Sequence, residues 1–283
     1  MTGLGKIDAD VFDRAIAPRL GASRADVRLG PTAGVDFGVL EVGGRAIVTA
    51  TDPLSILPAL GLERAGRLAT DIVLADVAVS GIAPSHLTVG LTLPREFATE
   101  TLAGVWSGVD TQARDLGVSV VATHAGRYPG VEGSWVGGAT AFGVGDGDDL
   151  VRPDGARPGD AIVVSTGPAA EIAGLFATLY PEELDLPVET VATAQERVDD
   201  IPAVADALAA HDAGRITAMH DATEGGIAGG LVEMATGADV RFDVEADAVP
   251  VADGVTAVCA AVDVDPWHVT SCGTLLCTVA EAD

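Results

Sequence analysis

The alternation of apolar and polar residues predicts that the first half of the chain mixes strands with helices. Two β-rich runs, 35–41 and 45–51, flank Val42-Gly43-Gly44, whose glycines suit a tight turn, and so they predict a hairpin. Helical spacing of apolar residues predicts a helix over 8–20 and a longer, largely buried helix over 62–81. The remaining expected elements are a strand near 86–93, a helix near 97–116, and strands near 118–123 and 135–144.

A polar, turn-rich segment between 145 and 160 interrupts this pattern and predicts a boundary between two domains, 1–150 and 151–283. The expected elements of the second domain are a strand at 161–165, a helix near 169–179, a helical region over 188–211, a strand at 215–220, a helix at 227–235 and a strand at 274–279. The chain therefore reads as α/β in its first domain and α+β in its second.

Composition narrows the range of environments and partners. No window approaches the roughly 18 uninterrupted apolar residues of a membrane helix, and the first residues lack a secretory pattern, so we expect a soluble, cytoplasmic protein. The formal charge of −26, from 42 acidic and 16 basic residues, disfavours binding to nucleic acid or to an anionic membrane. A salt-adapted (halophilic) cytoplasm explains this charge better than an acidic surface for one partner, and it predicts that low salt destabilises the protein.

The three cysteines, Cys259, Cys272 and Cys277, lack the CxxC spacing of a zinc site and lie in apolar surroundings. We interpret them as reduced residues in or near the core. A nucleophilic role for Cys272 is the alternative, but no basic partner for it is identifiable in the sequence.

Three carboxylates interrupt otherwise apolar segments: Asp36, Asp52 and Asp76. Burying a carboxylate is costly unless it is paired or bound to a metal. The hairpin should place Asp36 early in one strand and Asp52 at the end of the other. Mg²⁺ prefers oxygen ligands and commonly shares them with phosphates, so these residues indicate a site for a magnesium nucleotide.

A second motif follows the strand at 215–220. The run Asp221-Ala222-Thr223-Glu224-Gly225-Gly226 leads into a helix, and backbone N–H groups at the start of a helix suit an anion. Neither a GxxxxGK[ST] loop nor a GxGxxG fingerprint is present. For Asp221 and Thr223 the alternative is a helix cap.

Taken in order, these motifs resemble the aminoimidazole ribonucleotide (AIR) synthase related, or PurM-like, superfamily over nearly the whole chain. The residues that carry the resemblance are Gly34-Val35-Asp36, Thr51-Asp52, 75–84, Arg157-Pro158-Gly159-Asp160 and 221–226. The chain looks closest to the branch of hydrogenase maturation protein HypE and the archaeal AIR synthase related proteins. Thiamine-monophosphate kinase and selenophosphate synthetase are more distant members.

The resemblance implies a two-domain PurM-like fold. Its N-terminal sheet pairs with that of a second subunit in a homodimer, and its C-terminal α+β domain covers a cleft for Mg-ATP. Asp36, Asp52 and Asp76 would then hold metal and phosphate, with Asp52 and His124 as catalytic candidates. The implied nucleotide-binding set is completed by Lys6, Thr51, Asp221, Thr223, Gly225 and Gly226.

Each assignment has a structural alternative. Asp36 could shape a turn, Asp52 could cap the following segment, and Asp76 could lie on a solvated helix face. His124 could be a hydrogen-bonded structural histidine, and Lys6 could belong to a solvated terminus.

Two departures from the family pattern bear on activity. Ala75 stands where many members have asparagine, and the chain ends at Val279-Ala280-Glu281-Ala282-Asp283 without the cysteine of HypE-type proteins. The chain also stops soon after the expected strand at 274–279, earlier than in relatives of the family, so the second domain is expected to be shortened or truncated. We expect an ATP-dependent enzyme that activates an amide or carbamoyl oxygen of a small or protein-bound substrate by phosphoryl transfer. The alternatives are a small-metabolite kinase and a non-catalytic nucleotide-binding or assembly protein.

Overall fold

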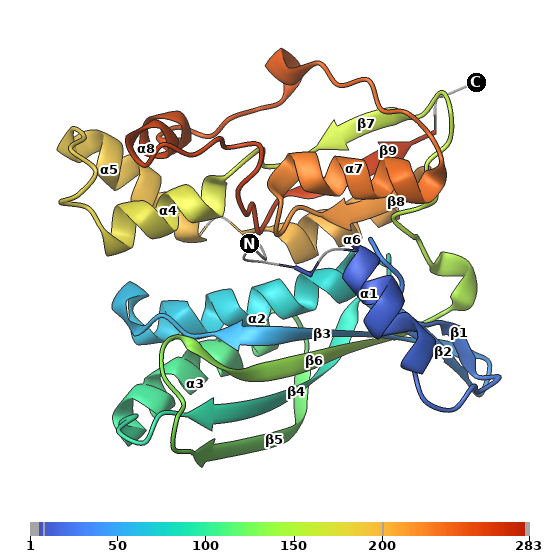
Figure 1. The fold of residues 1–283 in the computed structure, drawn as a ribbon, viewed down its shortest axis with the longest axis horizontal. Helices are drawn as coiled ribbons and strands as arrows, with labels where there is room; N and C mark the ends of the chain where they lie inside the picture. Colours follow the sequence, from blue (N-terminus) through green and yellow to red (C-terminus); the bar gives the residue numbers. More distant parts are fainter. Residues whose placement is uncertain (1–5, 8, 200, 281–283) are drawn as a thin grey trace.

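The computed structural model describes residues 6–7, 9–199 and 201–280, and it contains two sheets, one above the other in Figure 1. In the described part of the N-terminal half, six strands form a mixed sheet in the order β1-β2-β3-β6-β4-β5. The strands are β1 (Val27–Leu29), β2 (Phe37–Val42), β3 (Arg45–Ser55), β4 (Pro84–Leu93), β5 (Ser119–Arg127) and β6 (Trp135–Gly145). Only β4 and β5 run parallel, which fits a connection through helix α3 (Thr99–Asp115).

The predicted hairpin is confirmed, but its second strand is longer than expected. Val42 pairs with Arg45, and Gly43 and Gly44 both adopt positive φ in the turn. Strand β3 continues to Ser55 because β6 supplies ladder partners that far, so Asp52 lies inside the strand opposite Ala139. The expectation that Asp52 ends its strand is wrong. Asp36 directly precedes β2.

The long second helix is also confirmed, as α2 (Leu62–Ala78). It packs closely on α3 at Gly66 and Gly108, where an added Cβ would lie 2.0 Å from a backbone oxygen of the other helix. The predicted first helix is shorter than expected: α1 (Ala9–Ala15) is followed by the 3-10 turn η1 (Ala17–Arg19). Pro18 explains the interruption, because proline removes a donor from a continuing helix. Asp8, the expected start, lies outside the described residues.

In the C-terminal half, the described residues form a three-stranded antiparallel sheet in the order β7-β9-β8. Its strands are β7 (Ala161–Val164), β8 (Ile216–Asp221) and β9 (Leu275–Val279). The helices are α4 (Ala170–Leu179), α5 (Val188–Gln195), α6 (Ala203–Ala213), α7 (Gly226–Ala238) and α8 (Val255–Ala261). The region predicted as helical over 188–211 is divided into α5, η4 (Glu196–Asp199) and α6, with Pro202 directly before α6.

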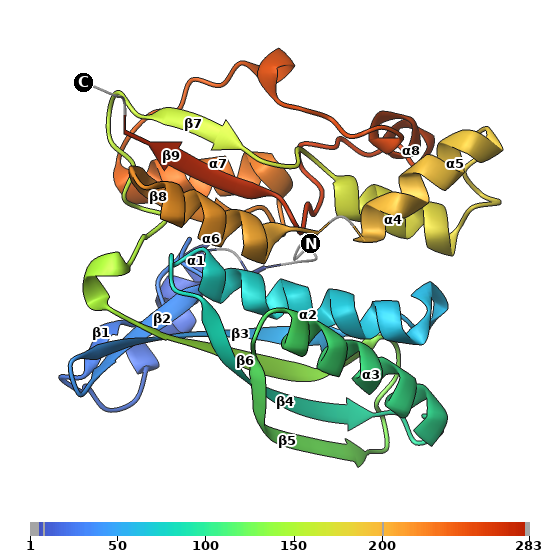
Figure 2. The same ribbon diagram turned by 180° about the vertical axis from the view of Figure 1, so that it is seen from behind.

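One of the hydrophobic clusters contains residues of both halves. Helix α6 contacts α2 on one side and the small sheet on the other (Figure 2). Through this contact, Val204, Met219 and Leu275 belong to the same buried cluster as Val48 and Val77 of the N-terminal half. The segment 146–160 that connects the halves contains only the 3-10 turn η3 (Gly147–Asp149). The shorter turns elsewhere are η2 (Pro58–Leu60) and η5 (Ala246–Ala248).

The three cysteines are free; Cys259 and Cys277 are buried, as predicted, and Cys272 is half-buried. Within the part of the chain that the structure describes, no helix combines the length and the apolar character needed to cross a bilayer. Strand β5 forms one edge of the large sheet, and none of its residues is buried.

Candidate functional site

A cleft of about 430 Å³ lies between α2 and β3 on one side and α4 and the loops next to β8 and β9 on the other. Its polar lining includes Lys6, Asp36, Asp52, Asp76, Thr223 and Glu224. The two halves therefore contribute carboxylates to the same space, although these residues are far apart in the sequence.

Asp36 enters this cleft from the segment before β2. Lys6 Nζ lies 2.8 Å from Asp36 Oδ1, so the N-terminal segment is paired with the site. Burial lowers the pKa of Lys6, but Asp36, Glu233 and Asp221 together raise it above its ordinary value, so Lys6 remains a cation. Gly34 adopts positive φ and lies next to Glu233, where an added Cβ would be 3.4 Å from Glu233 Cβ.

Asp52 and Asp76 form a carboxyl pair at the centre of the cleft. Asp52 shares a face of β3 with the buried residues Val48 and Ala50, and Asp76 is buried on α2. Burial raises the pKa of both groups, and the neighbouring Asp221 and Asp36 raise them further. The hydrogen bond between them favours the protonated form of Asp76, so Asp76 donates to Asp52. The alternatives of a cap for Asp52 and a solvated face for Asp76 are wrong.

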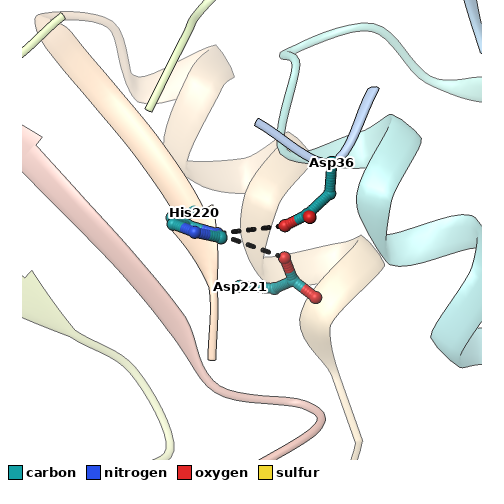
Figure 3. A group of neighbouring side chains, drawn as sticks. All are labelled: Asp36, His220 and Asp221. Carbon is teal, nitrogen blue, oxygen red and sulfur yellow. Dashed lines mark ion pairs between the residues drawn. The ribbon is translucent and has the colours of Figure 1, made fainter. Parts of the chain in front are cut away.

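His220 and Asp221, at the end of β8, lie next to Asp36 (Figure 3). His220 Nδ1 lies 3.4 Å from Asp221 Oδ1 and 3.7 Å from Asp36 Oδ2, and its Nε2 lies 2.8 Å from Glu233 Oε2. Burial lowers the pKa of His220, but the contacts with Asp221, Glu233 and Asp36 outweigh it and raise this pKa to about 10. Burial raises the pKa of Asp221, whereas the contact with His220 lowers it, and the net direction is down.

The oxygens of this cluster fit a divalent cation. Asp36 Oδ2 and Asp221 Oδ1 are buried, and their ion-pair contacts with His220 Nδ1, at 3.7 Å and 3.4 Å, leave both oxygens without a well-aligned hydrogen bond among the described residues. Asp36, His220 and Asp221 each offer a ligand atom within 4.8 Å of the others. Because its pKa of about 10 keeps His220 protonated, we assign it as a counter-ion and the carboxylates as the oxygen donors that Mg²⁺ prefers.

The turn before α7 borders the cleft through Thr223 and Glu224. The N-cap of α7 is Gly225, with no side-chain cap, so the interpretation of Asp221 or Thr223 as a helix cap is wrong. Gly226 adopts positive φ, and an added Cβ there would lie 2.4 Å from the Val269 carbonyl oxygen. Gly226 N also donates to the Thr223 carbonyl at 2.9 Å, which fixes Thr223 at the lining of the cleft.

Thr51 and His124 are not brought to this cluster within one chain. Thr51 is exposed on the face of β3 opposite to Asp52, where its hydroxyl lies 2.6 Å from that of Thr140. His124 is exposed on the edge strand β5 and lies 2.8 Å from the Tyr128 hydroxyl. Their assigned roles stay predictions.

Comparison with protein families identifies the fold and its relatives. The model for the N-terminal domain of AIR synthase related proteins matches residues 34–145, and that for the C-terminal domain matches 157–283. The chain belongs to the AIR synthase related family. The superfamily resemblance is thereby confirmed.

Among known relatives, carbamoyl dehydratase HypE of Rhizobium leguminosarum bv. viciae is 30% identical over 254 residues, covering 88% of this chain and 70% of the relative. The solved structure described as AaThiL complexed with AMPPCP and TMP has a TM-score of 0.73 at 21% identity, covering 89% of this chain and 81% of that one. The structure of HypE in complex with ATP has a TM-score of 0.62 at 23% identity, covering 96% and 75% of the two chains. At these identities the two structures show the fold alone.

Sequence reasoning assigned no role to three residues in or near the cleft of this AIR synthase related chain: the buried His220 and Glu171, and the half-buried Glu233. Glu171 is the only charged residue between Asp160 and Glu182, in the first turn of an otherwise apolar helix. Glu233 is similarly isolated on α7. The signal that revealed Asp76, a lone carboxylate in an apolar segment, was therefore also present at these positions.

Proposed function

We propose that this chain is a Mg-ATP-dependent enzyme of the HypE-like type that activates an amide or carbamoyl oxygen by phosphoryl transfer. The observation that carries the proposal is that Asp36, Asp52 and Asp76 line one cleft between the two halves and that the buried Asp221 lies beside them. The relatives support it by name: one is a carbamoyl dehydratase, and HypE has been solved in complex with ATP.

In this proposal the four aspartates hold Mg²⁺, which supplies charge neutralisation for the phosphates when it is bound. Lys6 contacts phosphate through its ammonium group, and the Thr223 hydroxyl, in the turn before α7, donates to a phosphate oxygen. The walls of the cleft exclude water and align the acceptor oxygen with the terminal phosphorus. Transfer of the phosphoryl group to that oxygen releases ADP and turns a poor leaving oxygen into phosphate.

The uncovered strand β5 supports the further proposal that the enzyme is a homodimer. Strand edges with free backbone groups pair readily with another chain, and Val121 on β5 is 57% exposed. A catalytic contact by His124, which is also on β5, would then belong to a site completed by the second subunit.

Calorimetric titration of Mg-ATP into the protein at high KCl tests the nucleotide site. We expect saturable binding that Asp52→Asn weakens by about tenfold, equivalent to about 1.4 kcal/mol. Asp243→Asn is the matched control, since Asp243 is exposed and pairs with Arg241 at the surface. Absence of binding to folded wild-type protein, or equal affinity of the Asp52 variant, would contradict the proposal.

A kinase acting on a small phosphorylated metabolite is the second candidate, favoured by the fold shared with AaThiL in its complex with AMPPCP and TMP. The fate of the transferred phosphate separates the candidates: it stays on the acceptor in a kinase and appears as inorganic phosphate after oxygen activation. Tight Mg-ATP binding without turnover of any acceptor would support a non-catalytic assembly role instead.

A further inference from the structure

A second polar group lines the cleft on the side of α4. Glu171, in the first turn of α4, is only 4% exposed and borders the cavity together with Thr270 and Cys272 from the loop before β9. Apolar residues continue the same lining: Leu57, Leu60, Leu68, Ile72, Ile172 and Leu175. The cleft therefore combines the aspartate cluster with an apolar wall and one further buried carboxyl.

The position of Glu171 is fixed by contacts between the loop 270–274 and the start of α4. Ala169 N donates to Ser271 Oγ at 2.8 Å, and Thr274 Oγ1 donates to the Gly167 carbonyl at 2.6 Å. The Glu171 carboxyl itself receives hydrogen bonds from the Cys272 backbone N–H and the Thr270 side chain. Through these contacts Glu171 helps to hold the loop 270–274 against the start of α4.

That structural role leaves one oxygen unexplained. Glu171 Oε2 is buried and has no hydrogen-bond partner among the described residues. A buried acceptor without a donor is destabilising, because it has lost its hydrogen bonds to water without replacement. Because Glu171 also borders the cleft, a donor on a ligand bound there is the partner that can satisfy Oε2.

The charge of Glu171 depends on few neighbours. Burial raises its pKa to about 7, against smaller lowering effects of Cys272 N–H and Thr270. The titratable group beside it is the Cys272 thiol, whose own pKa is raised by burial, by Glu171 and, more weakly, by Asp221 and Glu224. The Glu171 carboxyl therefore changes charge near neutral pH. Its oxygen can accept a hydrogen bond from a neutral donor or from a cationic donor.

We propose that Glu171 Oε2 accepts a hydrogen bond from an N–H-donating head group of the acceptor substrate, a carboxamide, carbamoyl or amidine group, while its apolar stem lies along Ile172 and Leu175. The role of this ligand as phosphoryl acceptor rests on the proposed function, whereas its binding does not. An anionic head group is excluded from this position by the surrounding carboxylates. An amide so placed keeps its oxygen free to face the phosphate side of the cleft.

The test uses benzamide, benzamidinium and benzoate, which differ only in their head group, without nucleotide. Ligand-observed NMR titrations at high KCl should show that the two N–H donors bind and that benzoate does not. In Glu171→Gln, which retains an acceptor oxygen but no charge, benzamidinium affinity should fall by about tenfold and benzamide affinity by less than about threefold. Glu171→Leu should lose both probes.

The pH profile gives a readout that a purely structural role of Glu171 does not produce. Benzamidinium affinity of the wild type should increase between about pH 6 and about pH 8 as Glu171 ionises, and Glu171→Gln should make this increase clearly smaller, leaving only the contribution of the aspartates that line the same cleft. Glu182→Gln, an exposed position after α4, is the matched control and should behave as wild type. Circular dichroism checks folding, and the Gln variant decides the outcome if the Leu variant does not fold.

Two results would overturn the inference: unchanged benzamidinium affinity in Glu171→Gln, or absence of binding of both donors to folded wild-type protein. A parallel titration of Glu171→Gln with Mg-ATP separates the two proposals. We expect its nucleotide affinity to stay within about threefold of wild type. Probe binding without any Mg-ATP binding would preserve this subsite and reject the proposed function.

Discussion

At the scale of single residues, the positive charge of His220 offsets the repulsion among the carboxylates of the candidate site. It is buried beside Asp221, Asp36 and Glu233, and these acidic contacts raise its pKa to about 10 although burial opposes them. Its folded pKa exceeds the ordinary value of 6.5. Protonated His220 therefore stabilises the fold fully below about pH 6.5, and this stabilisation is lost as pH rises through about 10.

We predict that His220→Gln lowers the free energy of unfolding of metal-free protein at neutral pH by about 3 kcal/mol, because a buried ion pair loses one partner. Chemical denaturation in the presence of a chelator measures this difference. The difference between the two proteins should become smaller as pH approaches 10, because His220 of the wild type then loses its proton. His268→Gln, at an exposed position paired with Asp265, is the control and should change stability by less than about 0.5 kcal/mol. Equal stability of the His220 variant and wild type would contradict the counter-ion role.

Residue patterns in the sequence located the carboxylates but not their counter-ions. Asp36, Asp52, Asp76 and Asp221 lie close together in the structure. The first three are indicated by the cost of a carboxylate in an apolar segment, and Asp221 is indicated by the polar, glycine-containing turn before a helix. His220 was not predictable in the same way, since its environment depends on Glu233 of α7 and Asp36 from the other half. Thr51 was assigned through the motif next to Asp52, but the alternation of a strand turns it to the opposite face.

At the scale of secondary structure, most helices and strands were predictable and their ends were not. The glycine turn between β2 and β3 and the apolar spacing of α2 are local signals, and both elements formed as expected. The extension of β3 to Ser55 depends on pairing with β6, about 85 residues away in sequence, so local periodicity could not show it. The division of the region 188–211 followed from Pro202, a signal that was present but not used.

The turn between β8 and α7 is the element most sensitive to a small substitution. Gly226 adopts a φ of +62°, and an added Cβ would lie 2.4 Å from Val269 O and 2.7 Å from Trp267 O. We predict that Gly226→Ala destabilises the protein by about 3 kcal/mol, from left-handed backbone strain and the carbonyl clash together. It should also weaken Mg-ATP binding, because the start of α7 moves.

Thermal unfolding and calorimetry on the same preparation measure both effects. Gly147→Ala is the control, since an added Cβ there meets nothing within 4 Å. It should leave the unfolding temperature and the Mg-ATP affinity close to wild type. A stable Gly226→Ala protein with full affinity would show that this turn does not position the phosphate side of the cleft.

At the scale of the whole molecule, the net charge of −26 sets the response to salt. Mutual repulsion of surface carboxylates destabilises a compact state when screening is weak. We predict that the unfolding temperature falls when KCl is reduced from about 3 M to about 0.1 M, and that a non-ionic osmolyte does not restore it. An unfolding temperature independent of KCl would favour the acidic partner surface over salt adaptation.

The central claim, that the aspartate cluster holds the metal of a bound nucleotide, is tested most directly by locating both. This requires a crystal structure with Mn²⁺ in place of Mg²⁺ and with a non-hydrolysable ATP analogue, in which the anomalous signal of manganese marks the metal. We predict a manganese peak among Asp36, Asp52, Asp76 and Asp221, with the phosphates between this peak and the start of α7. A nucleotide bound elsewhere, or manganese held away from these four carboxylates, would contradict the account.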